Sequence, residues 1–372
     1  MPHSPTEAPK DWTNIAFLGL TPVIGVLGTI WYTWKVGFEP WMLVLLVVSY
    51  FLVGVSICGG YHRLFSHRAY KASRGVQLFY AFFGAMASQN SILWWSSMHR
   101  IHHKWVDEDW DPYNIKRGFW WAHIVWIFYK NRDEEKLKNC PDLESNPVVR
   151  WQHKWYLPIL VVGGFGLPAA VGAMFGDAIA GLLWGGFLRT VLVHHSTFFV
   201  NSLAHTLGKQ EYSAEVSARD NWAVALLTLG EGYHSFHHRF AADYRNGTRW
   251  YQWDPTKWFI RGLSAAGQAW DLRATPAPVI QKARMQAGMI SMRNRLGDLP
   301  ETLAEEIERR MVLAREAIEE SLTLWRKHTE ERAEGMGRKW RETLSLSKRR
   351  AREAKRQWRE AIRMAGQVAR TA

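Results

Sequence analysis

Nine of the fifteen histidines in this 372-residue chain fall into four short groups. HRLFSH holds two, HRIHH three, NSLAH one and HSFHH three, which gives His62, His67, His99, His102, His103, His205, His234, His237 and His238. Residues three or four positions apart share one face of a helix, so HRIHH and HSFHH each present three imidazoles to one side. By the same spacing Asn201 shares a face with His205.

Clustered imidazoles of this kind indicate a metal. Adjacent neutral imidazoles need a partner and protonated ones repel, whereas neutral imidazole is a common ligand of transition ions. The nine histidines and Asn201 exceed the four ligands of structural zinc and the three of catalytic zinc, so we expect two sites of about five ligands each. Imidazole-rich sites without thiolate favour iron that reacts with oxygen, while copper and zinc stay open on ligand type alone.

Four apolar segments are long enough to cross a bilayer as helices, and they predict an all-α integral membrane protein. They are residues 13–34, 40–60, 157–176 and 178–200. Arg189, His194 and His195 interrupt the fourth segment, so its far end is expected to face protein or water rather than lipid.

Basic residues are concentrated in two parts of the chain. Segment 60–156, between the second and third spans, holds 14 Lys and Arg, and the chain after residue 200 holds 30. The link between the first two spans holds only Lys35, and the link between the last two holds neither Lys nor Arg. The positive-inside rule therefore predicts four spans with both termini and the histidine groups in the cytoplasm. Segment 1–12 is then a cytosolic N-terminal segment, and 61–156 with 201–270 form a helical cap that holds the di-metal site. The net charge of +13 fits contact with anionic lipid and requires no nucleic acid.

The words HRLFSH, HRIHH, NSLAH and GEGYHSFHH, in this order around the apolar spans, resemble the membrane-bound fatty acyl desaturases of the stearoyl-CoA (delta-9) type. Further matches are SQN at 88–90, DPYN at 111–114 and KRGFWWAH at 116–123. The resemblance covers about residues 15–260 and implies a four-span protein with a cytosolic cap holding two irons. It assigns the nine grouped histidines as iron ligands, with Asn201 completing the second shell or binding through water.

The resemblance also implies a reaction and a substrate tunnel. Dioxygen, two electrons and two protons remove two hydrogens from an acyl chain and leave a cis double bond and two waters. The residues implied for substrate binding are Gln89, Asn90, Trp95, Thr197 and Phe198 along the tunnel, Leu46 and Tyr50 at its closed end, and Lys116 and Arg117 near the headgroup. Ser97 and Met98 stand where animal acyl-CoA desaturases usually carry Arg-Asp, so both an acyl-CoA and an acyl chain on a membrane lipid stay open as substrates.

Electrons must come from a separate carrier, because the sequence contains no HPGG haem-binding word and no cysteine cluster. A cytochrome b5, ferredoxin or rubredoxin type of carrier with its reductase is expected. The nearest alternative function is a membrane di-iron hydroxylase of alkyl or acyl chains. A membrane metal transporter without catalysis is a more distant one, because its ligands should lie within the spans rather than at their ends.

The C-terminal third differs in composition. We expect a desaturase domain over 13–270, a linker over 271–300 and a charged amphipathic helical extension over 301–372, which holds 18 Lys and Arg against 13 Glu. Apolar residues such as Ile307, Ala314, Ile318 and Leu322 recur on one helix face. A solvated tail packed on the cap, a helix on the membrane surface and a helix for a partner or for self-association all fit this pattern.

Overall fold

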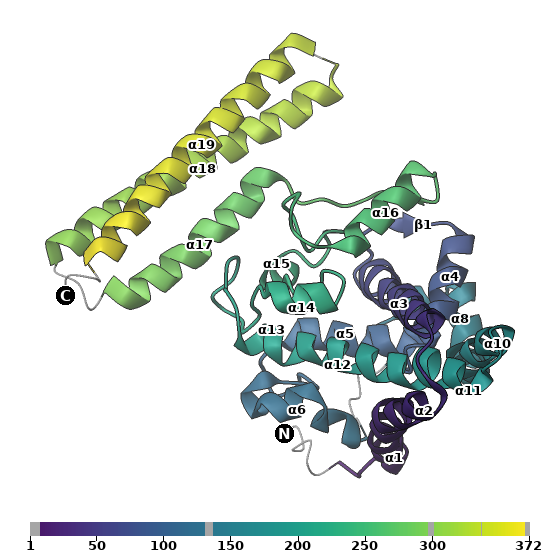
Figure 1. Ribbon diagram of the computed structural model, residues 1–372. Coiled ribbons are helices and arrows are strands. Elements are labelled where there is room, and N and C mark those ends of the chain that lie inside the picture. The colour runs from purple at the N-terminus through teal and green to yellow at the C-terminus, as the bar shows by residue number, and fades with distance from the viewer. Residues whose placement is uncertain (1–7, 131–136, 297–300, 336, 369–372) are drawn as a thin grey trace. The chain divides into compact units, whose positions relative to one another are not determined.

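The computed structural model describes residues 8–130, 137–296, 301–335 and 337–368 (Figure 1). Helices dominate them, and the one sheet in these residues pairs β1 (Lys71–Ala72) with β2 (Ala269–Trp270) antiparallel. The expected all-α class is therefore confirmed. The chain divides into two compact units, Met1–Lys209 with Val216–Ala274 and Gln210–Glu215 with Thr275–Ala372.

Three helices in the described residues are long and apolar enough to cross a membrane, and they coincide with the first three expected spans. Each consists of α-helical parts around or beside a π-helical part, in which hydrogen bonds reach five residues along the chain. They are α1 (Trp12–Pro22), η2 (Val23–Gly28) and α2 (Thr29–Val36), then α3 (Pro40–Val55) and η3 (Ser56–Ser66), then α9 (Tyr156–Val161), η6 (Val162–Gly166) and α10 (Leu167–Met174).

The fourth expected span is helical as well, through α11 (Ala178–Gly181), η7 (Leu182–Leu188) and α12 (Arg189–Asn201), but it is not among the three apolar helices. Its Arg189 is fully buried and donates to the backbone carbonyls of Gly164, Gly185 and Met86, with Nη2 2.8 Å from the Gly164 oxygen. A charge that cannot face lipid is thus satisfied by carbonyl oxygens inside the protein.

The helices α10 and α11 meet backbone to backbone at two glycines. A Cβ atom on Gly172 would lie 2.4 Å from the carbonyl oxygen of Asp177, and one on Gly181 would lie 2.3 Å from that of Pro168. Real Cβ atoms do not approach other atoms so closely, so only glycine permits this contact. The tight turn between these helices brings the last two apolar segments side by side.

The first unit also contains shorter helices, which pack around one hydrophobic core. They are α4 (Arg74–Ala85), α5 (Ile92–Trp105), η4 (Ile115–Arg117), α6 (Phe119–His123), η5 (Val125–Phe128), α7 (Pro141–Glu144), α8 (Pro147–Lys154), α13 (Leu203–Thr206), α14 (Trp222–Leu227), α15 (His234–Arg239) and α16 (Pro255–Ala265). Helix α5 packs on η3 and α8, and α4 packs on η3. Buried Tyr61, Phe65, Tyr80 and Ile92 join these helices in one hydrophobic core.

The second unit consists mainly of three long helices, α17 (Ala277–Leu296), α18 (Glu301–Ala333) and α19 (Gly337–Val368). Figure 1 shows α18 and α19 running side by side as a hairpin. Met285, Ile307, Ala314, Ile318 and Ala354 form their shared apolar core. The segment 271–300 is therefore more than the expected linker, because most of it is the 20-residue helix α17, whose Met285 is buried in this core.

Candidate metal centre

The four histidine groups of the sequence come together in two clusters of imidazoles. The first cluster, which we call the five-histidine cluster, is His62, His67, His99, His103 and His237, and the second, the four-histidine cluster, is His102, His205, His234 and His238. Within each cluster the candidate ligand atoms all lie within 4.8 Å of one another. Helix α5 serves both clusters, since His99 and His103 face the first and His102 faces the second.

The nitrogen atoms that converge are the Nε2 atoms. In the five-histidine cluster the Nε2 distances are 3.0 Å from His62 to His237, 2.8 Å from His67 to His99 and 2.9 Å from His103 to His237. In the four-histidine cluster they are 3.0 Å from His205 to His234, 3.0 Å from His234 to His238 and 3.3 Å from His102 to His238.

These spacings fit a metal ion at each cluster. Imidazole nitrogens lie about 2.0–2.1 Å from a bound first-row ion, so two ligands at right angles are about 3.0 Å apart. Neutral Nε2 atoms that face one another without an ion would bring lone pairs together. The donor set holds nitrogen and no thiolate, which suits iron, copper or zinc by ligand type.

A π-type turn at the end of η3 aligns His62 with His67. The His67 amide donates to the carbonyl oxygen of His62, five residues earlier, over 3.1 Å. In an ideal α-helix residues five apart point about 140° apart. The widened turn instead brings the two rings to a centroid distance of 4.8 Å. This local geometry explains how an HxxxxH spacing can serve a single metal site.

In each cluster, the Nδ1 atom of one histidine contacts a carboxylate, on the side of the ring opposite the converging Nε2 atoms. Nδ1 of His62 lies 2.8 Å from Oε2 of Glu231, and Nδ1 of His102 lies 2.9 Å from Oδ1 of Asp111. An acceptor at Nδ1 holds the proton there and leaves Nε2 free for a metal, and such outer partners orient the ring and raise its basicity. Spacing arguments missed both carboxylates, although they lie in the words GEGYHSFHH and DPYN.

His205 is oriented through a relay. Its Nδ1 donates to Oγ of Ser217 over 2.6 Å, and that hydroxyl donates to Oδ1 of Asp107 over 2.5 Å. The Ser217 amide also donates to Asp107, over 2.6 Å. Asp107 is 8% exposed, so the carboxylate acts in a largely dry environment. No sequence motif singled out Ser217 or Asp107, because they lie 110 residues apart.

Behind His62 a buried ionic network fixes Glu231. Arg63 is 1% exposed and donates from Nη2 to Oε1 of Glu231 at 2.9 Å, while it also pairs with Asp254 at 3.0 Å. Gly230 adopts φ +111°, and a Cβ there would lie 2.6 Å from Oδ1 of Asp254. The glycine before Glu231 is thus required for the carboxylate of Asp254 to come close. Removing one member of such a network leaves another charge buried without its partner.

Burial sets the protonation of the clusters. It lowers the pKa of seven of the nine imidazoles well below the usual histidine value, and the neighbouring imidazoles lower it further, at His67, His99, His103, His205, His234, His237 and His238. Burial alone would raise the pKa of Glu231, but its contacts with the His62 ring and the Arg63 guanidinium outweigh it and lower that pKa to about 2. These seven imidazoles are therefore neutral ligands at neutral pH, and the Glu231 carboxylate beside them is ionised.

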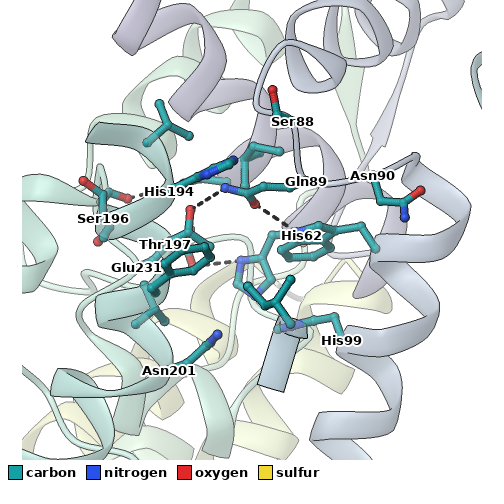
Figure 2. Close-up of a pocket in the computed structure, with 18 of the residues that line it drawn as sticks. His62, Ser88, Gln89, Asn90, His99, His194, Ser196, Thr197, Asn201 and Glu231 are labelled. Carbon is teal, nitrogen blue, oxygen red and sulfur yellow. Dashed lines mark hydrogen bonds and ion pairs between the residues drawn. The ribbon is translucent and has the colours of Figure 1, made fainter. Parts of the chain in front are cut away.

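One pocket is lined by residues of both clusters, and Figure 2 shows His62 and His99 of the five-histidine cluster among its lining side chains. His62 and His99 of the five-histidine cluster and His102 and His234 of the four-histidine cluster all line it. Across its middle, Nε2 of Gln89 donates to Oγ1 of Thr197 over 2.9 Å, and Nε1 of Trp95 donates to Oε1 of Gln89 over 3.2 Å. Most of the remaining lining is apolar and comes from α1, α3, α5 and α12.

Most residues expected to contact substrate line this pocket, namely Gln89, Asn90, Trp95, Thr197, Phe198 and Tyr50, and Asn201 lines it as well. The hydroxyl of Tyr50 lies 2.7 Å from Oγ of Ser196 and donates to the carbonyl oxygen of Leu227 over 2.5 Å. Tyr50 therefore bridges two sides of the pocket, and Figure 2 shows Ser196, Thr197 and Asn201 along one of them.

Three expected substrate residues do not line the pocket. Leu46 is buried on α3, one helical turn from Tyr50, and is not among the residues that line the pocket. Lys116 and Arg117 lie on η4, where Arg117 donates to the carbonyl oxygen of Asp109 and packs over the ring of Trp121. Their place at the surface keeps them available to a headgroup but outside the described cavity.

The chain is similar in sequence to proteins of one known family. The sequence model of the family described as "Fatty acid desaturase" matches residues 39–272. The chain is 42% identical to a protein named "Probable acyl-CoA desaturase" from Schizosaccharomyces pombe, over 74% of this chain and 57% of that one. It is 40% identical to "Acyl-CoA desaturase 1" of Saccharomyces cerevisiae, over 74% of this chain and 54% of that one.

A bacterial relative is covered more fully. The chain is 34% identical to a protein of Nostoc sp. named "sn-2 palmitoyl-lipid 9-desaturase", over 71% of this chain and 91% of the relative. The chain therefore spans little more than half the length of the two yeast proteins and nearly all of the bacterial one. The matched segment 39–272 contains all nine clustered histidines and Asn201.

Proposed function

This chain belongs to the fatty acid desaturase family, and from that premise we propose that it introduces a cis double bond at the delta-9 position of a saturated acyl chain. Dioxygen is the co-substrate, and a separate carrier supplies two electrons. The two removed hydrogens leave with the two oxygen atoms as water, together with two further protons. The observation that carries the proposal is the single apolar pocket that both histidine clusters line.

Two iron ions are the proposed cofactors. The five-histidine cluster would hold one, and the four-histidine cluster with Asn201, directly or through water, would hold the other. Bound iron supplies the oxygen activation that breaking an unactivated C–H bond requires, because such a bond offers no acidity to a general base. Glu231, Asp111 and the Ser217–Asp107 relay keep the ligand rings turned toward their ions.

The pocket residues position the acyl chain. An alkyl chain has no polar group to hold it at one depth, so the shape of the cavity must select the reacting carbons. The hydrogen-bonded bridge of Trp95, Gln89 and Thr197 fixes one wall next to His62, whose ring lies 6.1 Å from that of Trp95. Tyr50 closes the cavity at the end near Leu227 and sets a limit on chain length.

Membrane placement follows from the apolar helices. We propose four spans, the three apolar helices and α11–α12, with both termini and the two histidine clusters on the cytoplasmic side. The buried carbonyl cage around Arg189 allows the fourth helix to cross despite its charge. On that side a small soluble carrier of the cytochrome b5, ferredoxin or rubredoxin type, reduced by its own reductase, could reach the basic cap.

The donor of the acyl chain is proposed to be coenzyme A, as in the names of the two yeast relatives. A lipid-linked chain is the alternative, since the bacterial relative is named for one. Ser97 carries no charge, and it cannot contact a headgroup because it is fully buried with its Oγ bonded to Asn139 and the Leu137 amide. Any phosphate contact would fall to Lys116 and Arg117 on η4.

The test is a reconstitution of the purified, iron-loaded protein in lipid bilayers with an electron donor and dioxygen. Saturated acyl-CoA and phospholipid carrying the same acyl chain are supplied in parallel, and products are analysed by mass spectrometry. The proposal expects an alkene that has lost two hydrogens, formed from acyl-CoA. A product that has gained one oxygen would instead identify a hydroxylase, and an alkene from the phospholipid alone would move the substrate to the membrane lipid.

A further inference from the structure

The charges of the second unit are sorted between its two long helices. Helix α18 contains nine Glu against six Lys and Arg, whereas α19 contains eleven Lys and Arg against three Glu. Arg350 of α19 pairs with Glu320 of α18 at 3.0 Å, and Glu360 of α19 pairs with Arg310 of α18 at 3.4 Å. These two ion pairs join α18 to α19, and most of the basic residues of α19 take no part in them.

Six basic residues of α19 form a straight row, which we call the basic ridge: Arg341, Lys348, Arg352, Lys355, Arg359 and Arg363. At about 100° per residue they fall within a sector about 80° wide and extend about 33 Å along the helix. All six are exposed, and none forms an ion pair with an acidic residue in the part of the unit that the structure describes.

The ridge points away from the packed side of its helix. Thr343, Ser347 and Ala354 are buried, and Oγ of Ser347 donates to the carbonyl oxygen of Ser321 on α18 over 3.1 Å. On the helix wheel these three positions lie roughly opposite the ridge. Between Arg341 and Arg363 the sector of the ridge adds only Ser345 and no apolar residue. The ridge is therefore a purely electrostatic surface rather than one that inserts side chains into an apolar phase.

We infer that the basic ridge of α19 binds the anionic headgroup surface of the lipid bilayer that holds the chain. The apolar helices anchor the protein in that bilayer, so its headgroups are the polyanion present at the highest local concentration. A straight row of side chains on a rigid helix matches a flat surface, and basic residues near such a surface each add attraction that salt screens. This inference rests on membrane residence and not on the reaction at the histidine clusters.

The ridge can be tested with the full-length protein in lipid nanodiscs. A cysteine introduced as Ser345→Cys, within the sector of the ridge and between Arg341 and Lys348, carries a fluorescent donor, while the native Cys58 and Cys140 are buried and stay unlabelled. Headgroup-labelled lipid is the acceptor. We expect energy transfer to rise when about 30% of a neutral lipid is replaced by an anionic one, and to fall again in about 0.5 M salt.

Two variants of the labelled protein with the same change in net charge locate the effect. Replacing Arg341, Lys348, Arg352 and Arg359 by Gln should weaken the lipid-bound state by on the order of a hundredfold or more. The control replaces Arg309, Arg315, Arg326 and Lys327 on α18 by Gln and should keep the response. Equal energy transfer in neutral and anionic nanodiscs would overturn the inference, as would an equal loss in both variants. Circular dichroism establishes that each variant keeps its helices.

Discussion

Nδ1 of His62 lies 2.8 Å from Oε2 of Glu231, while Nε2 of the same ring lies 3.0 Å from Nε2 of His237. One imidazole thus connects a buried carboxylate to the five-histidine cluster. The two sides of the ring have different roles, because the carboxylate holds the proton and the opposite nitrogen is left as a ligand. Loss of the carboxylate should therefore weaken this ring as a ligand of the five-histidine cluster.

Replacing Glu231 by Gln should weaken metal binding at the five-histidine cluster by about 10–100-fold. The change removes the charge next to His62 and one of the two acidic partners of buried Arg63, so we also expect a loss of about 3 kcal/mol in the free energy of unfolding. Metal content by mass spectrometry and urea unfolding measure the two effects. The exposed Glu144→Gln control should change neither. Full metal content in the Glu231 variant would contradict the role given to this carboxylate.

The relay behind His205 predicts a separate effect on the four-histidine cluster. Ser217→Ala breaks the path from Nδ1 of His205 to Asp107, so one ion per chain should bind about tenfold more weakly. Competition with a chelator resolves the weak and the tight ion. Ser213→Ala in the same loop, where the hydroxyl accepts only from the Glu215 amide among the contacts described, serves as control. If both ions of the Ser217 variant bind as in the parent, the relay does not orient His205.

Acidification should destabilise the metal-free protein. The lowered pKa values keep the buried imidazoles neutral in the folded state, whereas the unfolded chain takes up protons below about pH 6.5. The unfolded state then binds more protons, so stability falls as pH falls, by about 1.4 kcal/mol per pH unit for each histidine that stays neutral. Urea unfolding of chelator-treated protein at several pH values measures the slope. A flat profile between neutral and mildly acidic pH would contradict the assigned protonation.

Tyr50 should determine the length of the acyl chain that fits. Tyr50→Ala removes the side chain that we propose closes the pocket and its hydrogen bond to the Leu227 carbonyl, so longer products are expected. Tyr50→Phe keeps the ring and loses only the contacts of the hydroxyl with Ser196 and Leu227, so it should keep the parent chain-length profile. Chromatography of the product acyl chains compares the three proteins. An unchanged profile in the alanine variant would mean that the pocket ends elsewhere.

The sequence predicted which histidines come together but not how they divide. Spacing placed His99, His102 and His103 on one side of a helix, and all three do face the clusters. Their division between two sites depends on α13 and α15 approaching α5 from distant parts of the chain. Helical periodicity also could not foresee the π-type turn that aligns His62 with His67, because the extra residue in that turn is invisible to a 3.6-residue pattern.

The residues that orient the histidine rings were the least predictable part of the site. Ser217 and Asp107 carry no spacing signal, since their contact depends on tertiary structure alone. In the C-terminal third, apolar residues that recur every three or four positions predicted the helix that is α18 in the structure. Ile307, Ala314 and Ile318 of that helix are in the core of the second unit. The same reasoning took 271–300 for a linker, because α17 has no clear apolar stripe and Pro276 and Pro278 at its start suggested an irregular segment.

The measurement that tests the account most directly is the fatty acid composition of a host that lacks its own desaturase and expresses this chain. Gas chromatography and mass spectrometry of total fatty acids, with the double bond located by derivatisation, should reveal a new cis monoene at the delta-9 position. A His102→Ala variant, which removes one ligand of the four-histidine cluster, should lack it. Folded, iron-loaded protein with a reducing partner that yields no monoene, or a monoene that persists unchanged in the His102 variant, would contradict the account.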